Sequence, residues 1–186
     1  NKPFGIEEIE AKFKRGIIER NIRQELNRLS ITDSLTGLYN QRHFYDRLNE
    51  ETVRAQRQNH DLALILLDLD DFKQYNDNFG HLAGDELLQQ VGAVINGKMR
   101  QNVDSGYRYG GDEFAVMLIE AGESVAKMMS GRIKAGILEE CHISASSGFA
   151  IFERGLSFEA LVGEADRRLY EDKARNKAQK AVTQAH

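Results

Sequence analysis

The chain has 186 residues, 41% of them hydrophobic and 29% charged, which is typical of a globular protein and excludes a fibrous or disordered one. Its net charge of −4 argues against a nucleic-acid surface, because duplex binding draws on many Lys and Arg side chains. No apolar run approaches the roughly 20 residues that span a bilayer, and the first residues lack the features of a secretion signal. We therefore expect this segment to lie in the cytoplasm without membrane contact, although the intact protein could be membrane-tethered.

The first 32 residues lack strand patterns and carry an apolar stripe at helical spacing. The stripe consists of Ile6, Ile9, Phe13, Ile17, Ile18, Ile22, Leu26 and Leu29. It changes phase near Gly16, as a stutter does in a coiled coil, and the other faces mix Glu, Lys and Arg. A helix packed on its own domain would have the same pattern. We favour a signalling linker over residues 1–32, which pairs two chains and connects them to an upstream sensory domain missing from this sequence.

A structured turn from Asp33 to Asn40 marks the start of a second domain, which we expect to cover residues 33–178 before a tail of 179–186. Periodicity predicts helices over 42–57, 72–78, 84–95, 124–138 and 158–177, and strands over 62–67, 103–109, 114–119 and 142–152. This order predicts an α/β (α+β) sandwich, in which a central sheet containing antiparallel strands is flanked by helices. The single cysteine, Cys141, has no disulfide partner and is expected in the core.

Two groups of carboxylates stand beside these predicted strands. The apolar run 62–67, which should be a central strand, is followed by Asp68, and the hairpin after residue 109 carries Asp112 and Glu113. If the two strands are neighbours, these side chains converge and raise one another's pKa unless a cation neutralises them. Their hard oxygen atoms suit Mg²⁺ or Mn²⁺. Acidic residues in turns are usually only solvated, so either group alone would not indicate a site.

The exact amino-acid sequence of these segments makes the interpretation more specific. Residues 110–114 read Gly-Gly-Asp-Glu-Phe, and six further motifs accompany them in order. These are Asp33-x-Leu35-Thr36-Gly37-Leu38-x-Asn40, Asp68-x-Asp70-x-Phe72-Lys73, Asn76-Asp77-x-x-Gly80-His81-x-x-Gly84-Asp85, Arg108-Tyr109, Ser147-Gly148 and Ala165-Asp166-x-x-Leu169-Tyr170-x-x-Lys173. Seven motifs in register are far more specific than one. Over about residues 30–178 the chain resembles the GGDEF diguanylate cyclases.

The resemblance implies a palm-like nucleotide cyclase fold and a nucleotidyltransferase activity. Members of the family condense two GTP into 3′,5′-cyclic di-GMP, a second messenger, and two pyrophosphates at the interface of a homodimer. By similarity, Asp68, Asp112 and the backbone carbonyl of Leu69 would hold Mg²⁺ or Mn²⁺, two ions per half-site. Glu113 would be a metal-site residue or the general base near the ribose 3′-hydroxyl. These roles suit phosphoryl transfer, which needs charge neutralisation and in-line placement.

The same resemblance implies which residues bind GTP. The terminal phosphates would be held by lysine side chains and turn amides, and the glycines of the signature would let the backbone approach the nucleotide. The phosphate-site residues are Lys73, Lys173, Lys177, Asp71, Phe72, Gly110 and Gly111. Asn76 and Asp85 would read guanine, with His81 in the same motif, because a carboxylate can accept the guanine N1–H and 2-amino hydrogens. Asp85 could instead cap a helix that starts near Gly84.

The chain departs from the family pattern after Lys173. Where the family usually has Gly-Arg-Asn, this sequence has Asn176-Lys177-Ala178. The positive charge is retained at Lys177, but the forked geometry of arginine is lost. Arg175 is nearby and is a candidate replacement.

A second departure concerns the inhibitory product site of many family members, Arg-x-x-Asp, shortly before the signature. Asp104 is in register, but Gln101 stands at the arginine position and cannot grip phosphate with a cationic fork. Arg100 would point to the opposite face if the segment is extended. We therefore expect high-affinity inhibition by cyclic di-GMP at this site to be absent.

Two other classes of function fit the sequence less well. A catalytically inactive GGDEF domain would act as a GTP-binding or dimerisation module, but the intact Asp68, Asp112 and Glu113 count against it. A different nucleotide cyclase or polymerase palm is disfavoured by the combination of Asn76 with Asp85. We therefore expect an active diguanylate cyclase.

Overall fold

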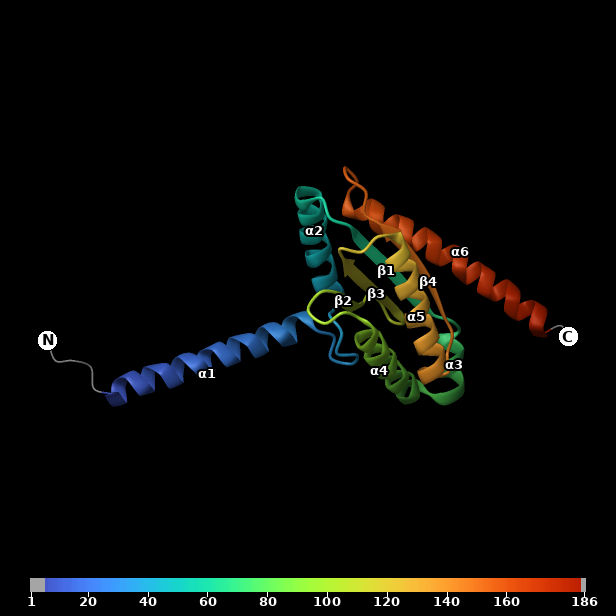
Figure 1. Cartoon of the computed structure of the whole chain (residues 1–186). Coiled ribbons are helices and arrows are strands. Elements are labelled where there is room, and N and C mark those ends of the chain that lie inside the picture. The colour runs from blue at the N-terminus through green and yellow to red at the C-terminus, as the bar shows by residue number, and fades with distance from the viewer. Residues whose placement is uncertain (1–5, 185–186) are drawn as a thin grey trace.

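The computed structural model describes residues 6–184, without the side chains of residues 6–9, 11, 23–25, 27–30 and 180–184. The helices are α1 (Ile6–Ile31), α2 (Gln41–Gln58), α3 (Phe72–Phe79), α4 (His81–Lys98), α5 (Glu123–Cys141) and α6 (Phe158–Gln184). The strands are β1 (Leu62–Leu69), β2 (Ser105–Arg108), β3 (Glu113–Ile119) and β4 (Ala145–Ile151). Figure 1 shows one sheet covered by helices, with α1 projecting away from it.

The sheet has four strands in the order β2-β3-β1-β4, and every neighbouring pair is antiparallel. All eight residues of β1 are buried, as expected for an apolar run with a strand on each side and helices on both faces. The register pairs Asp68 of β1 with Glu113 of β3. The antiparallel sheet flanked by helices confirms the predicted α+β sandwich.

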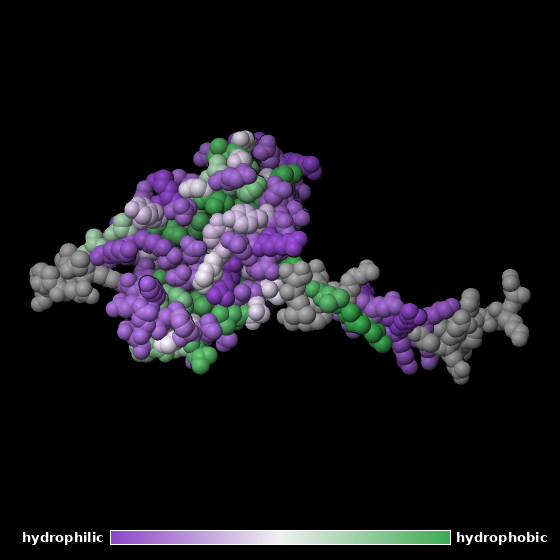
Figure 2. Space-filling view, turned by 180° about the vertical axis from the view of Figure 1, so that it is seen from behind, coloured by the Kyte–Doolittle hydropathy of each residue, from purple (hydrophilic) through white to green (hydrophobic). Residues whose placement is uncertain are grey.

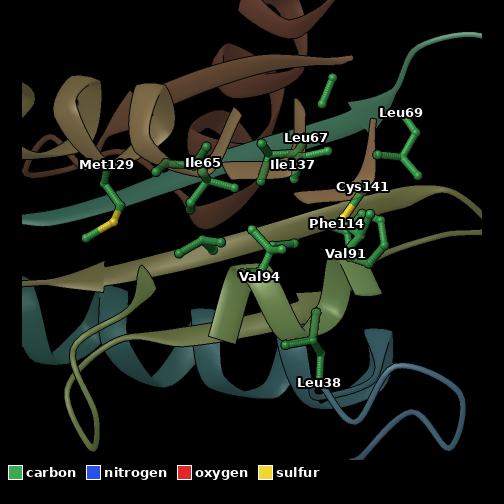
Figure 3. Packing of buried hydrophobic residues seen from close by; sticks show 14 of the residues in the cluster. Leu38, Ile65, Leu67, Leu69, Val91, Val94, Phe114, Met129, Ile137 and Cys141 are labelled. Carbon is green, nitrogen blue, oxygen red and sulfur yellow. The ribbon is translucent and has the colours of Figure 1, made fainter. Parts of the chain in front are cut away.

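The side chains of β1 alternate between two hydrophobic clusters, because successive residues of a strand point to opposite faces. Ile65 and Leu67 pack with α4 and α5, and Figure 3 shows them gathered with Val94 and Ile137 from these helices. Leu64 and Leu66 pack with α2 and α6 on the other face. Each fully buried side chain of this size contributes about 1.5–3 kcal/mol. By the same alternation Asp68 faces the α6 side.

Cys141 is 6% exposed and belongs to the α4/α5 cluster, which confirms its expected place in the core.

Several predicted boundaries are wrong for local reasons. Helix α4 begins at His81, not at residue 84, because Gly80 adopts a φ of 85° that ends α3 and starts α4 at one residue. Strand β2 begins at Ser105, since residues 101–103 form a turn in which Asn102 has a φ of 60°. Helix α6 continues to Gln184, past residue 177, where the predicted helix ended.

The predicted N-terminal helix is present as α1, and its described apolar side chains are open to solvent. The exposed fractions are 71% for Phe13, 45% for Ile17, 57% for Ile18, 55% for Ile22 and 64% for Leu26. Figure 2 shows a green, hydrophobic stripe along the projecting helix. The side chains of Ile6, Ile9 and Leu29 lie outside the described set. Across the described residues, no helix is long and apolar enough to cross a membrane.

Candidate active site

The carboxylates predicted to converge do so at the end of the sheet where β1 finishes and β3 begins. Asp68 and Glu113 are register partners, and the amide of Leu69 donates to the Asp112 carbonyl at 3.3 Å. Burial, together with the charge of Asp112, raises the pKa of Asp68 against the lowering effect of Lys173. Burial and the charge of Asp68 raise the pKa of Glu113. The sheet therefore gathers negative charge at one place.

Helix α6 supplies the cation that faces this charge. Lys173 Nζ lies 2.6 Å from Asp68 Oδ2, and the Asp68 side chain is only 12% exposed. A partly buried pair of this kind is screened much less by salt than an exposed one. The contact brings together Lys173 and Asp68, which are more than a hundred residues apart in sequence.

A divalent ion requires more oxygen ligands than two carboxylates supply. Among the described residues, no group of three or more His, Cys, Asp or Glu side chains is placed to hold a metal ion. Mg²⁺ commonly binds through one or two carboxylates and completes its coordination with substrate phosphates. Asp68 and Asp112 line one pocket and repel each other electrostatically, so they fit an ion whose remaining ligands come from a nucleotide.

The signature turn is held by its own backbone and by one arginine. The amide of Gly110 donates to the Glu113 carbonyl at 3.1 Å, and Arg108 Nη2 donates to the Gly111 carbonyl at 2.9 Å. A Cβ added at Gly110 would lie 2.4 Å from Glu113 Oε2, so a side chain there would displace this carboxylate. A Cβ at Gly111 would meet nothing within 4 Å, which leaves that backbone open to a ligand.

A pocket of about 250 Å³ opens beside the carboxylates and collects most of the predicted phosphate-site residues. It is lined by Asp68, Leu69, Asp70, Asp71, Phe72, Lys73, Asp112, Lys173, Asn176 and Lys177. The turn that contributes Asp71 to this lining is tight, because Asp71 adopts a left-handed φ of 61° before α3. Lysine side chains and carboxylates on one pocket suit a phosphate group that is bound together with a cation.

The predicted guanine-site residues lie on α3 and α4. Asn76 Oδ1 is buried and has no hydrogen-bond partner among the described residues. A Cβ added at Gly84 would lie 1.8 Å from this atom, so Asn76 packs directly against the backbone of α4. Asp85 follows Gly84 and is exposed, as is His81. The idea that Asp85 caps α4 is wrong, because the helix begins four residues earlier, after Gly80.

Three residues at the pocket form hydrogen bonds that the sequence interpretation did not include. Ser146 Oγ donates to Asp70 Oδ1 at 2.6 Å, and Asn176 Nδ2 donates to Ser146 Oγ at 2.9 Å. Asp70 belongs to one of the quoted motifs, so the sequence could have indicated that its carboxylate has a role. Nothing in the sequence indicates that Ser146 contacts Asn176. Arg175, the candidate replacement for arginine, does not line the pocket, and it pairs with Asp172 at 3.1 Å.

The segment of the expected inhibitory site differs from the extended form that was assumed. Residues 100–104 form a turn, in which Arg100 binds Asp104 through two bonds of 2.9 Å and 2.7 Å. The backbone amide of Arg100 also donates to Asp104 at 3.1 Å, and the Asp104 side chain is fully buried. Asp104 is thus occupied within the chain by an arginine that was expected to point away.

Comparisons with known proteins agree with this geometry. Residues 30–179 match the family model described as diguanylate cyclase, GGDEF domain. The chain is 33% identical over 174 residues, 91% of its length, to the diguanylate cyclase DgcS of Shewanella oneidensis, of which it covers 58%. It is 34% identical over 168 residues, 85% of its length, to the diguanylate cyclase DosC of Escherichia coli K12, of which it covers 36%.

The solved structures that resemble the chain belong to the same group. The coiled coil and GGDEF domain of DgcB from Caulobacter crescentus, in complex with c-di-GMP, matches with a TM-score of 0.79 and 29% identity, over 89% of this chain and 94% of that one. The diguanylate cyclase SiaD of Pseudomonas aeruginosa, in complex with its activator SiaC, matches with a TM-score of 0.78 and 29% identity, over 90% and 67%. The chain spans between 22% and 58% of the length of the first curated relatives.

Proposed function

This chain belongs to the GGDEF domain family of diguanylate cyclases, and from that premise we propose that it condenses two GTP into 3′,5′-cyclic di-GMP and two pyrophosphates. The observation that carries the proposal is the pocket in which Asp68 and Asp112 face Lys73, Lys173 and Lys177. Phosphoryl transfer needs carboxylates that bind a divalent cation and cationic side chains that bind phosphates, and this pocket contains both.

Mg²⁺ or Mn²⁺, two ions per half-site, would be held by Asp68, Asp112, Glu113 and the Leu69 carbonyl. When bound, these ions neutralise phosphate charge and stabilise the attacking and leaving oxygens. Glu113, the register partner of Asp68, either joins these metal ligands or accepts the proton of the ribose 3′-hydroxyl as the general base.

The remaining residues orient GTP. Lys73, Lys173 and Lys177 hold the terminal phosphates, with the amides of Asp71 and Phe72, the backbone of Gly110 and the open backbone of Gly111. Asn76, Asp85 and His81 read guanine. The buried, unpartnered Oδ1 of Asn76 supports this role, since such an atom is stabilised by a donor that a ligand brings.

The chemistry requires two chains. Each 3′-oxygen bonds to the α-phosphorus of the other GTP, the bond between that phosphorus and the bridging oxygen breaks, and pyrophosphate leaves. A single half-site holds one GTP, so the competent species is a homodimer with facing sites. We propose that residues 1–32 form the linker that pairs two chains below an upstream sensory domain, and that residues 33–178 form the cyclase domain in the cytoplasm.

The proposal also predicts the absence of tight product inhibition at Asp104. Its carboxylate is buried and bound by Arg100, so it offers no free acceptor to a second ligand. Initial rates measured with added cyclic di-GMP should show only weak inhibition at the active site. Potent non-competitive inhibition that disappears in Asp104→Ala would show that this site binds product in spite of Gln101.

The proposal is tested by substituting the two residues of the signature acid pair. Asp112→Ala and Glu113→Ala should each lower cyclic di-GMP formation by about a hundredfold or more, with circular dichroism unchanged. Glu86→Ala removes an exposed carboxylate of α4 outside the site and serves as the control. Turnover that survives either substitution would refute the assigned chemistry.

A further inference from the structure

Three consecutive residues of β4, Gly148, Ser147 and Ser146, each contact a successive turn of helix α6. At Gly148 the two backbones touch, because an added Cβ would lie 2.1 Å from the Ala165 carbonyl oxygen and 2.2 Å from the Leu169 nitrogen. One helical turn later, Asp172 accepts the amide of Ser147 at 2.9 Å. The contacts therefore determine how far α6 reaches along the sheet.

The next turn of α6 brings Asn176 to Ser146. Asn176 Nδ2 donates to Ser146 Oγ at 2.9 Å and approaches Asp70 Oδ2 at 3.4 Å. The serine hydroxyl donates in turn to Asp70 Oδ1 at 2.6 Å, and Ser146 is completely buried. One amide, one hydroxyl and one carboxylate from three elements thus form a closed network.

This network joins two walls of the phosphate pocket. Asp70 belongs to the turn after β1, and its amide is also held by the Ser144 carbonyl at 2.8 Å. Asn176 belongs to α6, where residues three and four positions apart share a face, so it stands beside Lys173 and adjoins Lys177. The turn and the lysine-bearing helix line the same pocket of about 250 Å³.

We propose that Asn176 is a positioning residue, which holds the Lys173 and Lys177 side of the pocket at the separation from the Asp70 turn that a nucleoside triphosphate requires. The inference rests on the proposed function, because it takes GTP as the ligand. An asparagine amide offers two hydrogens and can serve both acceptors. Glycine at this position makes neither bond, and aspartate places a second carboxylate beside Asp70.

The hydrogen bonds of Asn176 matter because the neighbouring phosphate-binding residue, Lys177, is a lysine and not an arginine. A guanidinium fork can hold phosphate at two points, whereas the ammonium of Lys177 is a point charge on a flexible stem. The contribution of Lys177 to phosphate binding therefore depends on the position of its Cα atom on α6. The hydrogen bonds of the preceding residue, Asn176, hold the helix backbone at this position.

The experiment compares binding of a triphosphate with binding of a monophosphate. The probes are 3′-deoxy-GTP, which lacks the attacking hydroxyl and cannot react, and GMP, each measured by calorimetry with Mg²⁺. Asn176→Ala should weaken 3′-deoxy-GTP binding about tenfold, as expected for a hydrogen bond to a charged group, and leave GMP binding within twofold. Asn176→Asp should weaken the triphosphate further.

The control is Arg175→Ala, which removes an exposed cation of the same helical turn that does not line the pocket. It should change neither affinity. A double-mutant cycle with Ser146→Ala should give losses smaller than the sum of the single losses, because both changes break one network.

Equal loss of both probes in Asn176→Ala, or unchanged binding of 3′-deoxy-GTP, would overturn the proposal; the first result would mean a general structural role. Melting temperatures of the variants identify any loss of fold. If the wild-type chain binds 3′-deoxy-GTP but forms no cyclic di-GMP from GTP, the proposed function fails while the positioning role can still be measured.

Discussion

At residue scale, Gly84 and Asn76 depend on each other. A methyl group at Gly84 would clash with Asn76 Oδ1, whereas the next nearest residue, Phe72, lies 3.3 Å away. Since the clashing atom is the end of a side chain, Gly84→Ala should move the Asn76 amide and leave the fold intact. We expect GTP preference over ATP to fall about tenfold or more in a competition assay, because the polar group that meets guanine is displaced.

The control for this substitution is Gly97→Ala, a glycine of α4 whose added Cβ meets nothing within 4 Å. It should leave the GTP preference unchanged. If Gly84→Ala also left it unchanged, Asn76 would have no part in guanine recognition.

Glu113 gives the protein a pH-dependent stability. Its folded-state pKa lies above the ordinary value of 4.5, because of burial and the charge of Asp68, so the folded state binds a proton more tightly than the unfolded state. The free energy of unfolding therefore falls as pH rises through the raised pKa. In metal-free protein, Glu113→Gln should raise the melting temperature near about pH 8, and the gain should shrink towards about pH 4. Calorimetry across this range measures it, with Glu86→Gln as the control; a pH-independent difference would contradict the expectation.

Because Asp68, Asp112 and Glu113 stand at the ends of predicted strands, their convergence could be predicted from sequence on the condition that the two strands pair, as β1 and β3 do. The hydrogen bonds of Asp104 could not, since residues 100–104 close into a turn that no periodicity marks. Asn176 and Ser146 were also missed. Their contact depends on how α6 is registered along β4, and that is determined by packing between distant segments.

At element scale, the close approach of α6 to β4 depends on Gly148. A Cβ there would lie 2.1 Å and 2.2 Å from backbone atoms of α6, which cannot rotate away as a side chain can. Gly148→Ala should lower the free energy of unfolding by about 1–3 kcal/mol and shift Lys173 from Asp68. Chemical denaturation measures the loss.

Gly163→Ala is the matched control on α6, because an added Cβ meets nothing within 4 Å. Removing a glycine from a helix interior should leave stability equal or raise it by about 0.5–1 kcal/mol. If Gly148→Ala were equally harmless, the backbone contact would not determine where α6 lies.

Most elements followed from sequence, and the errors were at their ends. The apolar run of β1 predicted a central strand, and the sheet order confirms it. The start of α4 was misplaced because Gly80 closes one helix and opens the next, whereas glycine in a sequence marks only a break. The end of α6 was placed too early, since its last turns lack a clear apolar stripe.

At the scale of the whole molecule, α1 extends away from the domain with its described apolar residues exposed, among them Phe13 and Leu26. An exposed stripe of this kind can pair with a second copy and raise the effective concentration of one half-site near the other. Deleting residues 1–30 should therefore lower activity per chain most strongly in dilute protein. Rates across a dilution series measure this, and equal rates at every concentration would reduce α1 to a passive tether.

The measurement that tests the central claim most directly is incubation of the chain with GTP and Mg²⁺ at several protein concentrations, with separation and identification of the products. The account predicts cyclic di-GMP and pyrophosphate in a one-to-two ratio, formed at a rate per chain that rises with protein concentration until the dimer is saturated. Intact GTP at every concentration, or a product that is not a cyclic dinucleotide, would contradict it.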